Sequence, residues 1–281
     1  MSTVLITDHA WPDLEIERAV IEGAGFRVVA GPTVPASAAT IASLAREHQP
    51  TSILTCWAQV DANAVSASDA LRHVGRIGVG LDNIDVAACS ARGIPVTNVP
   101  DYCIEEVSDH VLGFALAWIR GIVAFDRAVR AGRWDPAQAR LRRLATQTVG
   151  IVGYGRIGRA TARKFLAFGC RVLVHSRSAP EPAVGIDVVD LDALLAASDI
   201  VVLHVPLSAT TRHLIDARRI AQMKPGSLLI NVSRGGLVDT GAVIEALRVG
   251  WLGAAALDVL ESEPEVPQAL LEQPAALLTP H

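Results

Sequence analysis

The sequence predicts an α/β protein of two domains, each built around a doubly wound parallel sheet. Three observations support this fold class. The chain has 281 residues, which is more than one hydrophobic core usually holds, so two domains are expected. Hydrophobic residues make up 51% of the chain, enough to bury both faces of a sheet. Short runs rich in Val and Ile alternate with helical patterns, which is the order of βαβ units.

The first half of the chain, residues 1–99, is predicted to form one domain. Apolar residues follow helical spacing over residues 14–22 and 38–47. Before, between and after these helices we expect parallel strands at residues 4–6, 27–30, 52–54, 74–77 and 95–99.

The second half, residues 100–281, is predicted to form the other domain. It opens with a long helical segment at residues 107–131, which carries no strand signal. Trp118, Phe125 and Trp134, with the arginines of residues 139–143, are expected either in a subunit interface or packed on their own domain. Six strands, enough for a complete doubly wound sheet, are expected at residues 149–152, 171–175, 200–204, 227–232, 253–258 and 276–278.

The overall charge and the cysteine pattern exclude several classes of protein. A net charge of -4 gives no broad basic field, which argues against nucleic acid or an anionic membrane as the main partner. The four cysteines form no CxxC pair, and the histidines outside the motifs below are not spaced as metal ligands, so no metal is predicted. The first residues read as a strand rather than as a signal peptide, so we expect a cytoplasmic protein.

A glycine-rich turn lies between the apolar run of residues 148–152 and a helical pattern from Arg159 to Phe168. Glycine permits both the tight bend and a close approach of the backbone to a pyrophosphate, which would bind at the N-terminus of the helix. The strand, turn and helix context predicts a dinucleotide site at Gly153, Tyr154, Gly155, Arg156, Ile157 and Gly158.

The end of the next strand bears on the choice of cofactor. An NAD-binding sheet normally has an acidic residue there to bind the ribose 2'-hydroxyl, and this chain has none. Ser176 and Arg177 instead offer a hydroxyl and a guanidinium that suit a 2'-phosphate, which favours NADP(H) and leaves NAD(H) possible. The alternative is an exposed loop arginine that binds no ligand.

Several segments, in order along the chain, resemble one protein family. They include RIGVGLDNID from Arg76, GIPVTNVP from Gly93, the glycine turn, HVPL from His204, SRGGLVD from Ser233, DVLESEP from Asp258, and the final TPH. Together they are similar to the D-isomer-specific 2-hydroxyacid dehydrogenases. This family includes phosphoglycerate dehydrogenase, hydroxypyruvate and glyoxylate reductases, formate dehydrogenase, and the C-terminal-binding-protein corepressors.

The resemblance implies roles for three residues in catalysis. Arg234 corresponds to the arginine that clamps the substrate carboxylate and carbonyl, and its planar fork suits bidentate contact. His281 corresponds to the general acid of reduction. Glu263, rather than Glu261, corresponds to the carboxylate that hydrogen-bonds this imidazole. The spacings of 29 and 18 residues between these three leave room for one strand and a loop in each interval.

The resemblance also implies residues that contact the substrate and the cofactor. Val79 and Gly80 match a loop whose backbone N–H groups hold the substrate carboxylate. Arg76 either faces the substrate or is an ordinary surface arginine, and Trp57 either lines the pocket, favouring a bulky keto acid, or belongs to the core. Asp258 resembles the residue that contacts the nicotinamide amide. The remaining residues expected near the cofactor are His204, Val205, Pro206, Val232 and Ser233.

The resemblance implies reduction of a 2-keto acid to a D-2-hydroxy acid by an NAD(P)H-dependent homodimer. We expect a flavodoxin-like substrate domain, a Rossmann-like cofactor domain and an active site in the interdomain cleft. Relatives continue past TPH with a helix that returns to the first domain, and that segment is expected to be missing here. The alternatives are a corepressor-like protein that senses a dinucleotide, or a dehydrogenase acting on phosphoglycerate or phosphite.

Overall fold

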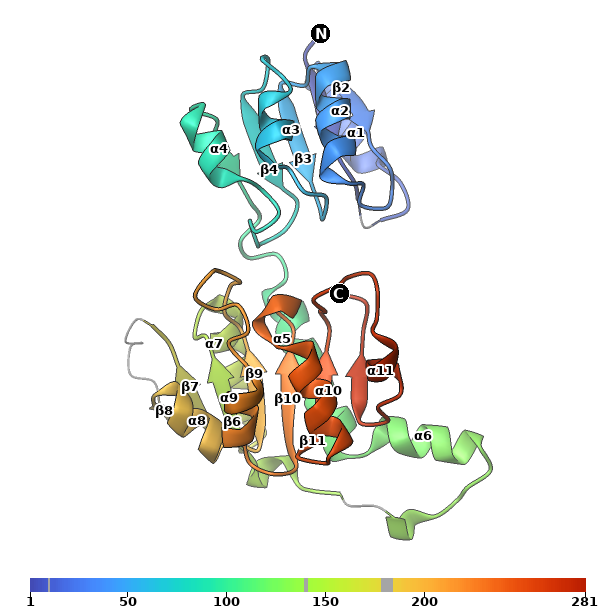
Figure 1. The fold of residues 1–281 in the computed structure, drawn as a ribbon, viewed down its shortest axis with the longest axis vertical. Helices are drawn as coiled ribbons and strands as arrows, with labels where there is room; N and C mark the ends of the chain where they lie inside the picture. Colours follow the sequence, from blue (N-terminus) through green and yellow to red (C-terminus); the bar gives the residue numbers. More distant parts are fainter. Residues whose placement is uncertain (10, 139–140, 178–183) are drawn as a thin grey trace. The chain divides into compact units, whose positions relative to one another are not determined.

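The computed structural model describes residues 1–9, 11–138, 141–177 and 184–281 and divides the chain into two compact units. The first unit is Met1–Tyr102 and the second is Cys103–His281, and each is described by itself. Both consist of parallel strands with helices between them, so the predicted α/β fold class is confirmed (Figure 1).

The described part of the first unit contains a five-stranded parallel sheet in the order β2-β1-β3-β4-β5. The order reverses between β1 and β3, as in flavodoxin-like folds. Its elements are β1 (Thr3–Ile6), α1 (Glu15–Gly23), β2 (Arg27–Ala30), α2 (Ala38–His48), β3 (Ser52–Thr55), α3 (Ala62–Ser66), β4 (His73–Arg76), α4 (Val86–Ala91) and β5 (Val96–Thr97).

Successive residues of these strands point to opposite faces of the sheet. On one face Leu5 packs with Ile41 of α2, Val65 of α3 and Cys89 of α4. On the other, Ile6 packs with Ile21 of α1. The sheet is therefore covered on both sides, which explains why successive residues of its inner strand β1, such as Leu5 and Ile6, are both apolar.

The second unit contains, in its described part, a seven-stranded parallel sheet in the order β12-β11-β10-β9-β6-β7-β8. Its elements are α5 (Ile104–Ile119), α6 (Ile122–Arg130), β6 (Thr148–Val152), α7 (Arg156–Ala167), β7 (Arg171–His175), β8 (Ile186–Val188), α8 (Leu191–Ala197), β9 (Ile200–Leu203), α9 (Ala217–Gln222), β10 (Ser227–Asn231), α10 (Thr240–Arg248), β11 (Leu252–Leu257), α11 (Gln268–Leu271) and β12 (Ala276–Leu278), with short 3₁₀ helices at Pro136–Gln138, Leu144–Thr146 and Gly235–Leu237.

Alternation along the strands again divides the core into two faces. Val202 of β9 packs with Phe114 of α5 and Phe165 of α7, whereas its neighbour Leu203 packs with Leu195 of α8 and Val243 of α10. The strand order reverses between β6 and β9, which is the position where doubly wound sheets bind ligands beyond the carboxyl ends of their strands.

Two details of the second unit differ from the prediction. The described part of the sheet has seven strands where six were expected. The strand not predicted is the edge strand β8, which is only three residues long and has two exposed residues. The helix expected over residues 107–131 is two helices with a bend of 57° between them. Gly121 adopts a left-handed backbone at the bend, with φ of 62°, which ends the first helix.

Among the described helices, no single one has the length and apolar composition to cross a membrane. In the part of the chain that the structure describes, one bent pair of helices, α5 and α6, meets both criteria together. Of this pair, α5 contributes buried residues such as Val111 and Ile119 to the core of its own unit.

Candidate active site

The glycine turn between β6 and α7 brings several segments of backbone into close contact. Gly153 has φ of 101°, and a Cβ there would lie 2.4 Å from the carbonyl oxygen of His204. At Gly158 a Cβ would lie 2.1 Å from the carbonyl oxygen of Gly153, so α7 approaches the turn closely. A Cβ on Gly155, the N-cap residue, would meet nothing within 4 Å. The space beside Gly155 is therefore open at the helix N-terminus, where the sequence predicts that a pyrophosphate binds.

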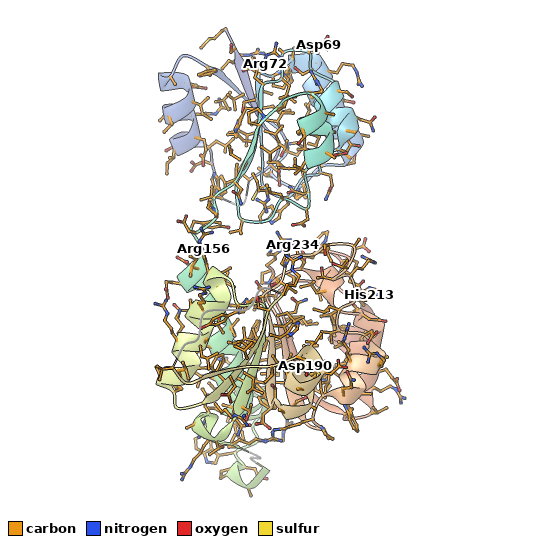
Figure 2. All side chains as sticks on the ribbon, turned by 90° about the vertical axis from the view of Figure 1, so that its left-hand side faces the viewer. Asp69, Arg72, Arg156, Asp190, His213 and Arg234 are labelled. Atoms are coloured by element: carbon orange, nitrogen blue, oxygen red, sulfur yellow. The ribbon has the colours of Figure 1, made fainter. Side chains whose placement is uncertain are left out.

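The side chains of the turn lie around this N-terminus. Tyr154 is half-buried, and the guanidinium of Arg159 lies 5.4 Å from the centre of its ring. Arg156, the first residue of α7, is exposed, whereas Ile157 is half-buried. Figure 2 shows Arg156 and Arg234 at the same end of the second unit.

His204 follows β9 and ties the end of this strand to α7. Its Nε2 lies 2.9 Å from the hydroxyl oxygen of Thr161. Some of the residue's surface is accessible, but burial of the ring lowers the pKa of His204 to about 3, so the imidazole is neutral at physiological pH. A neutral ring adds no charge beside the glycine turn. The residues after it, Val205 and Pro206, are half-buried and exposed, respectively.

The end of β7 carries the residues expected to select the cofactor. Ser176 is half-buried and Arg177 is exposed, so both side chains have access to solvent and to a ligand. Residues 178–183, which follow Arg177, lie outside the described residues, as do residues 139 and 140 of the arginine-rich stretch.

Arg234 is held by a turn that begins at the last residue of β10. The amide of buried Asn231 accepts from the backbone N–H of Ser233 at 3.1 Å and donates to the carbonyl of Arg234 at 2.8 Å. The Ser233 hydroxyl donates to the carbonyl of Leu203 at 2.8 Å. These bonds fix the backbone on both sides of Arg234. Val232, also expected near the cofactor, is half-buried beside this turn.

The turn of Arg234 packs directly against the segment that leads to Glu263. A Cβ on Gly235 would lie 1.9 Å from the carbonyl carbon of Leu260. The backbone N–H of Leu260 in turn donates to Oε1 of Glu263 at 2.7 Å. Only glycine at position 235 permits this close approach, which brings the arginine and the carboxylate into one local structure.

Glu263 and His281 form a hydrogen-bonded pair. Their Oε2 and Nδ1 atoms are 2.9 Å apart, and both side chains are about one third exposed. Burial alone would raise the pKa of Glu263, but the bonds from His281 and the Leu260 N–H, with the charges of His281 and Arg234, together lower it. The carboxylate is thus ionised and accepts a hydrogen bond from Nδ1 of His281. The other ring nitrogen, Nε2, is not used by this bond.

Glu261 has different partners and is separate from this pair. It lies 2.6 Å from Nε2 of His213 and accepts from both the N–H and the hydroxyl of Thr240, at 3.0 and 2.7 Å. Glu261 therefore joins the loop before α9 to the start of α10. Of the two glutamates in this segment, Glu263 is the one that contacts His281.

The substrate residues predicted in the first unit lie where β3 and β4 end. Arg76 is only 9% exposed and its guanidinium packs over Gly78, so it is not a surface arginine. Trp57 is half-buried and its backbone N–H donates to Asp8 at 2.7 Å. Val79 and Gly80, also half-buried, follow β4.

Asp8 is a residue that the sequence analysis missed. Its carboxylate is completely buried after β1 and accepts from the backbone N–H groups of Cys56, Trp57 and Ala58. It therefore shapes the loop that carries Trp57. An isolated Asp after a first strand gives no sequence signal for this role, because the partners lie about fifty residues further along the chain.

Comparison with known proteins identifies the family. Residues 5–174 match the model of the D-isomer specific 2-hydroxyacid dehydrogenase catalytic domain, and residues 112–281 match that of the family's NAD binding domain. The chain belongs to this family. It is therefore an oxidoreductase, an NAD(P)-dependent dehydrogenase that interconverts a 2-keto acid and a D-2-hydroxy acid, and the predicted family and enzyme class are confirmed.

Among its relatives in the dehydrogenase family, a hydroxypyruvate reductase from Thermotoga maritima is 37% identical over 79% of this chain and 74% of its own length. A glyoxylate reductase from Pyrococcus furiosus is 40% identical over 79% of this chain and 69% of its own length. The structure of an NADPH-dependent glyoxylate/hydroxypyruvate reductase from Sinorhizobium meliloti, in complex with NADP and malonate, is 33% identical, covers 100% of this chain and 86% of its own, and has a TM-score of 0.86.

Proposed function

We propose that this dehydrogenase reduces a small 2-keto acid of the glyoxylate and hydroxypyruvate class and prefers NADPH. The observation that carries the proposal is the hydrogen-bonded pair of Glu263 and His281 beside the turn of Arg234. In this proposal the first unit contributes substrate contacts from Trp57, Arg76, Val79 and Gly80, and the second unit binds the dinucleotide.

In this proposal, residues of the second unit have separate roles in the reduction. The nicotinamide, when bound, supplies the hydride. Arg234 binds the substrate carboxylate with its guanidinium and polarises the carbonyl. His281 donates the proton from Nε2 to the carbonyl oxygen, since its Nδ1 is engaged by Glu263. Glu263 accepts from Nδ1 and so holds the ring in one orientation.

The remaining cofactor residues contribute binding and orientation. The turn from Gly153 to Gly158 receives the pyrophosphate, and Asp258 accepts from the nicotinamide carboxamide. Neutral His204, with Val205 and Pro206, supports the cofactor from the end of β9. Ser176 and Arg177 bind the 2'-phosphate. The absence of an acidic side chain at positions 175–177 and the NADP bound to the Sinorhizobium meliloti relative support the preference for NADPH.

We also propose that the enzyme is a homodimer. Helix α6 buries no residue in its own unit, and Figure 1 shows it running out from the sheet. Ile122, Val129 and Trp134 are 55, 46 and 85% exposed. Trp118, in contrast, packs on its own core. Light scattering after gel filtration tests the proposal, and Trp134→Glu should shift a dimer toward the monomer.

Oxidation of NADPH and NADH, followed in parallel by absorbance, tests the reaction. The substrates are glyoxylate, hydroxypyruvate, pyruvate and phenylpyruvate, with phosphoglycerate and phosphite tried in the oxidative direction. We expect the highest kcat/KM for glyoxylate or hydroxypyruvate with NADPH. Arg234→Lys should lower kcat/KM while NADPH binding is unchanged. A preference for phenylpyruvate would contradict the substrate class, and a preference for NADH would contradict the role of Ser176 and Arg177.

A further inference from the structure

A histidine outside all the sequence motifs, His110 of α5, reaches the end of the sheet in its own unit. Its Nε2 lies 2.9 Å from the hydroxyl oxygen of Thr279, the residue after β12. The same nitrogen is 3.6 Å from Oδ1 of Asp258, the residue after β11. Thr279 also bonds Oδ1 of Asp258 directly. Three elements thus converge on one oxygen of one carboxylate.

The direction of these bonds follows from the chemistry of the groups. An ionised carboxylate only accepts, so the single hydroxyl hydrogen of Thr279 points to Asp258. The hydroxyl oxygen is then the acceptor for His110, which must carry its hydrogen on Nε2. The result is a directed chain from the His110 ring through the Thr279 hydroxyl to the Asp258 carboxylate.

This chain of hydrogen bonds is anchored at both ends. The edge of Phe114, one turn along α5, packs on the His110 ring, with the centroids 4.4 Å apart and the planes at 73°. The backbone N–H of Asp258 donates to the carbonyl of Asn231 at 3.0 Å, and that of Thr279 to the carbonyl of Leu257 at 3.2 Å. With both backbones fixed, the hydroxyl of Thr279 restricts rotation of the Asp258 carboxylate.

We propose that His110 and Thr279 are positioning residues for the nicotinamide end of the cofactor. They hold Oδ1 of Asp258, so that Oδ2 is presented to the carboxamide N–H. The inference rests on the proposed contact between Asp258 and the cofactor, and it adds two residues that act through Asp258 without touching the cofactor. Thr279 precedes Pro280 and His281, so the same hydroxyl also fixes the segment that carries the proton donor.

Equilibrium binding of NADPH to the whole chain, measured by calorimetry without substrate, tests the proposal separately from turnover. His110→Leu and Thr279→Val remove the two links with little change in shape. Each should weaken NADPH binding about 10-fold, since hydrogen bonds to a charged group are among the stronger ones. His110→Gln and Thr279→Ser retain a donor and a hydroxyl and should stay within about 2-fold of the wild type. The double variant His110→Leu/Thr279→Val should bind NADPH no more weakly than either single variant, because both residues belong to the same chain of hydrogen bonds.

A matched control is available in the first unit. His73 and Thr97 make the same kind of contact, with Nε2 and the hydroxyl oxygen 2.9 Å apart, but among the described residues no carboxylate bonds to this threonine hydroxyl. Thr97→Val should leave NADPH binding unchanged. If Thr97→Val and Thr279→Val weaken binding equally, the effect is one of general stability and the proposal is wrong.

Asp258→Ala distinguishes this inference from the function on which it rests. If Asp258→Ala weakens NADPH binding but His110→Leu and Thr279→Val do not, the role of Asp258 stands and the positioning chain is refuted. If Asp258→Ala has no effect on binding or turnover, the proposed contact of Asp258 with the cofactor is itself wrong. If all three substitutions weaken NADPH binding, while His110→Gln and Thr279→Ser bind NADPH nearly as well as the wild type, the positioning role of His110 and Thr279 is supported.

Discussion

His204 gives a quantitative prediction because its environment changes its protonation so strongly. Burial lowers its pKa from 6.5 to about 3, so the folded protein keeps the ring neutral while the unfolded chain takes up a proton below pH 6.5. The unfolded state then binds more protons than the folded state. Stability from this residue is therefore complete above pH 6.5 and is lost progressively as the pH falls from 6.5 toward 3.

The two pKa values set the size of the effect. Between about pH 7 and about pH 5, a shift of this size costs roughly 2 kcal/mol of unfolding free energy. Solvent reaches part of the residue, so we expect about 1 to 2 kcal/mol. In His204→Gln the side-chain amide retains a partner for the Thr161 hydroxyl but does not titrate. Between about pH 7 and about pH 5, the unfolding free energy of this variant should therefore fall by about 1 to 2 kcal/mol less than that of the wild type.

Urea unfolding at several pH values measures this difference. Hydrogen exchange in β9 during unfolding assigns the transition to the second unit, because the two units need not unfold together. His48→Gln, on α2 of the first unit, controls for the loss of a histidine as such. Equal losses of stability in the wild type and in His204→Gln between the two pH values would refute the assignment of a buried neutral ring.

Two further predictions concern the proposed catalytic residues. Glu263→Gln should lower kcat for keto acid reduction by at least about 10-fold, since a neutral amide binds the His281 ring less strongly than the carboxylate and orients it less well, whereas Glu261→Gln should leave kcat nearly unchanged. Steady-state kinetics of the two variants compares them directly, and equal losses would contradict the separate partners of the two glutamates. Gly235→Ala should destabilise the second unit by about 1 to 3 kcal/mol and also reduce kcat, because its Cβ would collide with the backbone of Leu260. Thermal unfolding and turnover of this variant should decline together, and normal stability would contradict the close contact.

Much of the fold was predictable because both sheets are buried on both faces. A strand such as β9, Ile200–Leu203, is a continuous apolar run whose every side chain enters the core, so its position is plain in the sequence. The edge strand β8 has no such run, since Asp187 and Val188 are exposed. The break between α5 and α6 was missed because apolar residues continue across it, although the glycine at position 121 was a signal for it.

The candidate site divides in the same way. Arg234, Glu263 and His281 lie in short sequence motifs, and the chemical groups of these residues already indicate the roles predicted for them. Asp8 and His110 have no motif, and their roles depend entirely on partners distant in sequence, for His110 on a hydroxyl 169 residues further along. Single-sequence patterns report local structure and chemistry, so contacts of this kind were beyond them.

The sheet also explains why the catalytic motifs occur in their order. Asn231 at the end of β10 pairs with Leu257 of β11, and Leu257 pairs with Leu278 of β12. Three adjacent parallel strands thus end at one level, and the residues just beyond them meet there. The two intervals hold more than the strand and loop expected from their lengths, since α10 and β11 lie in the first and α11 and β12 in the second. Each is a crossover that returns the chain to the same edge of the sheet, so the spacing of the motifs is set by the helix each crossover must contain.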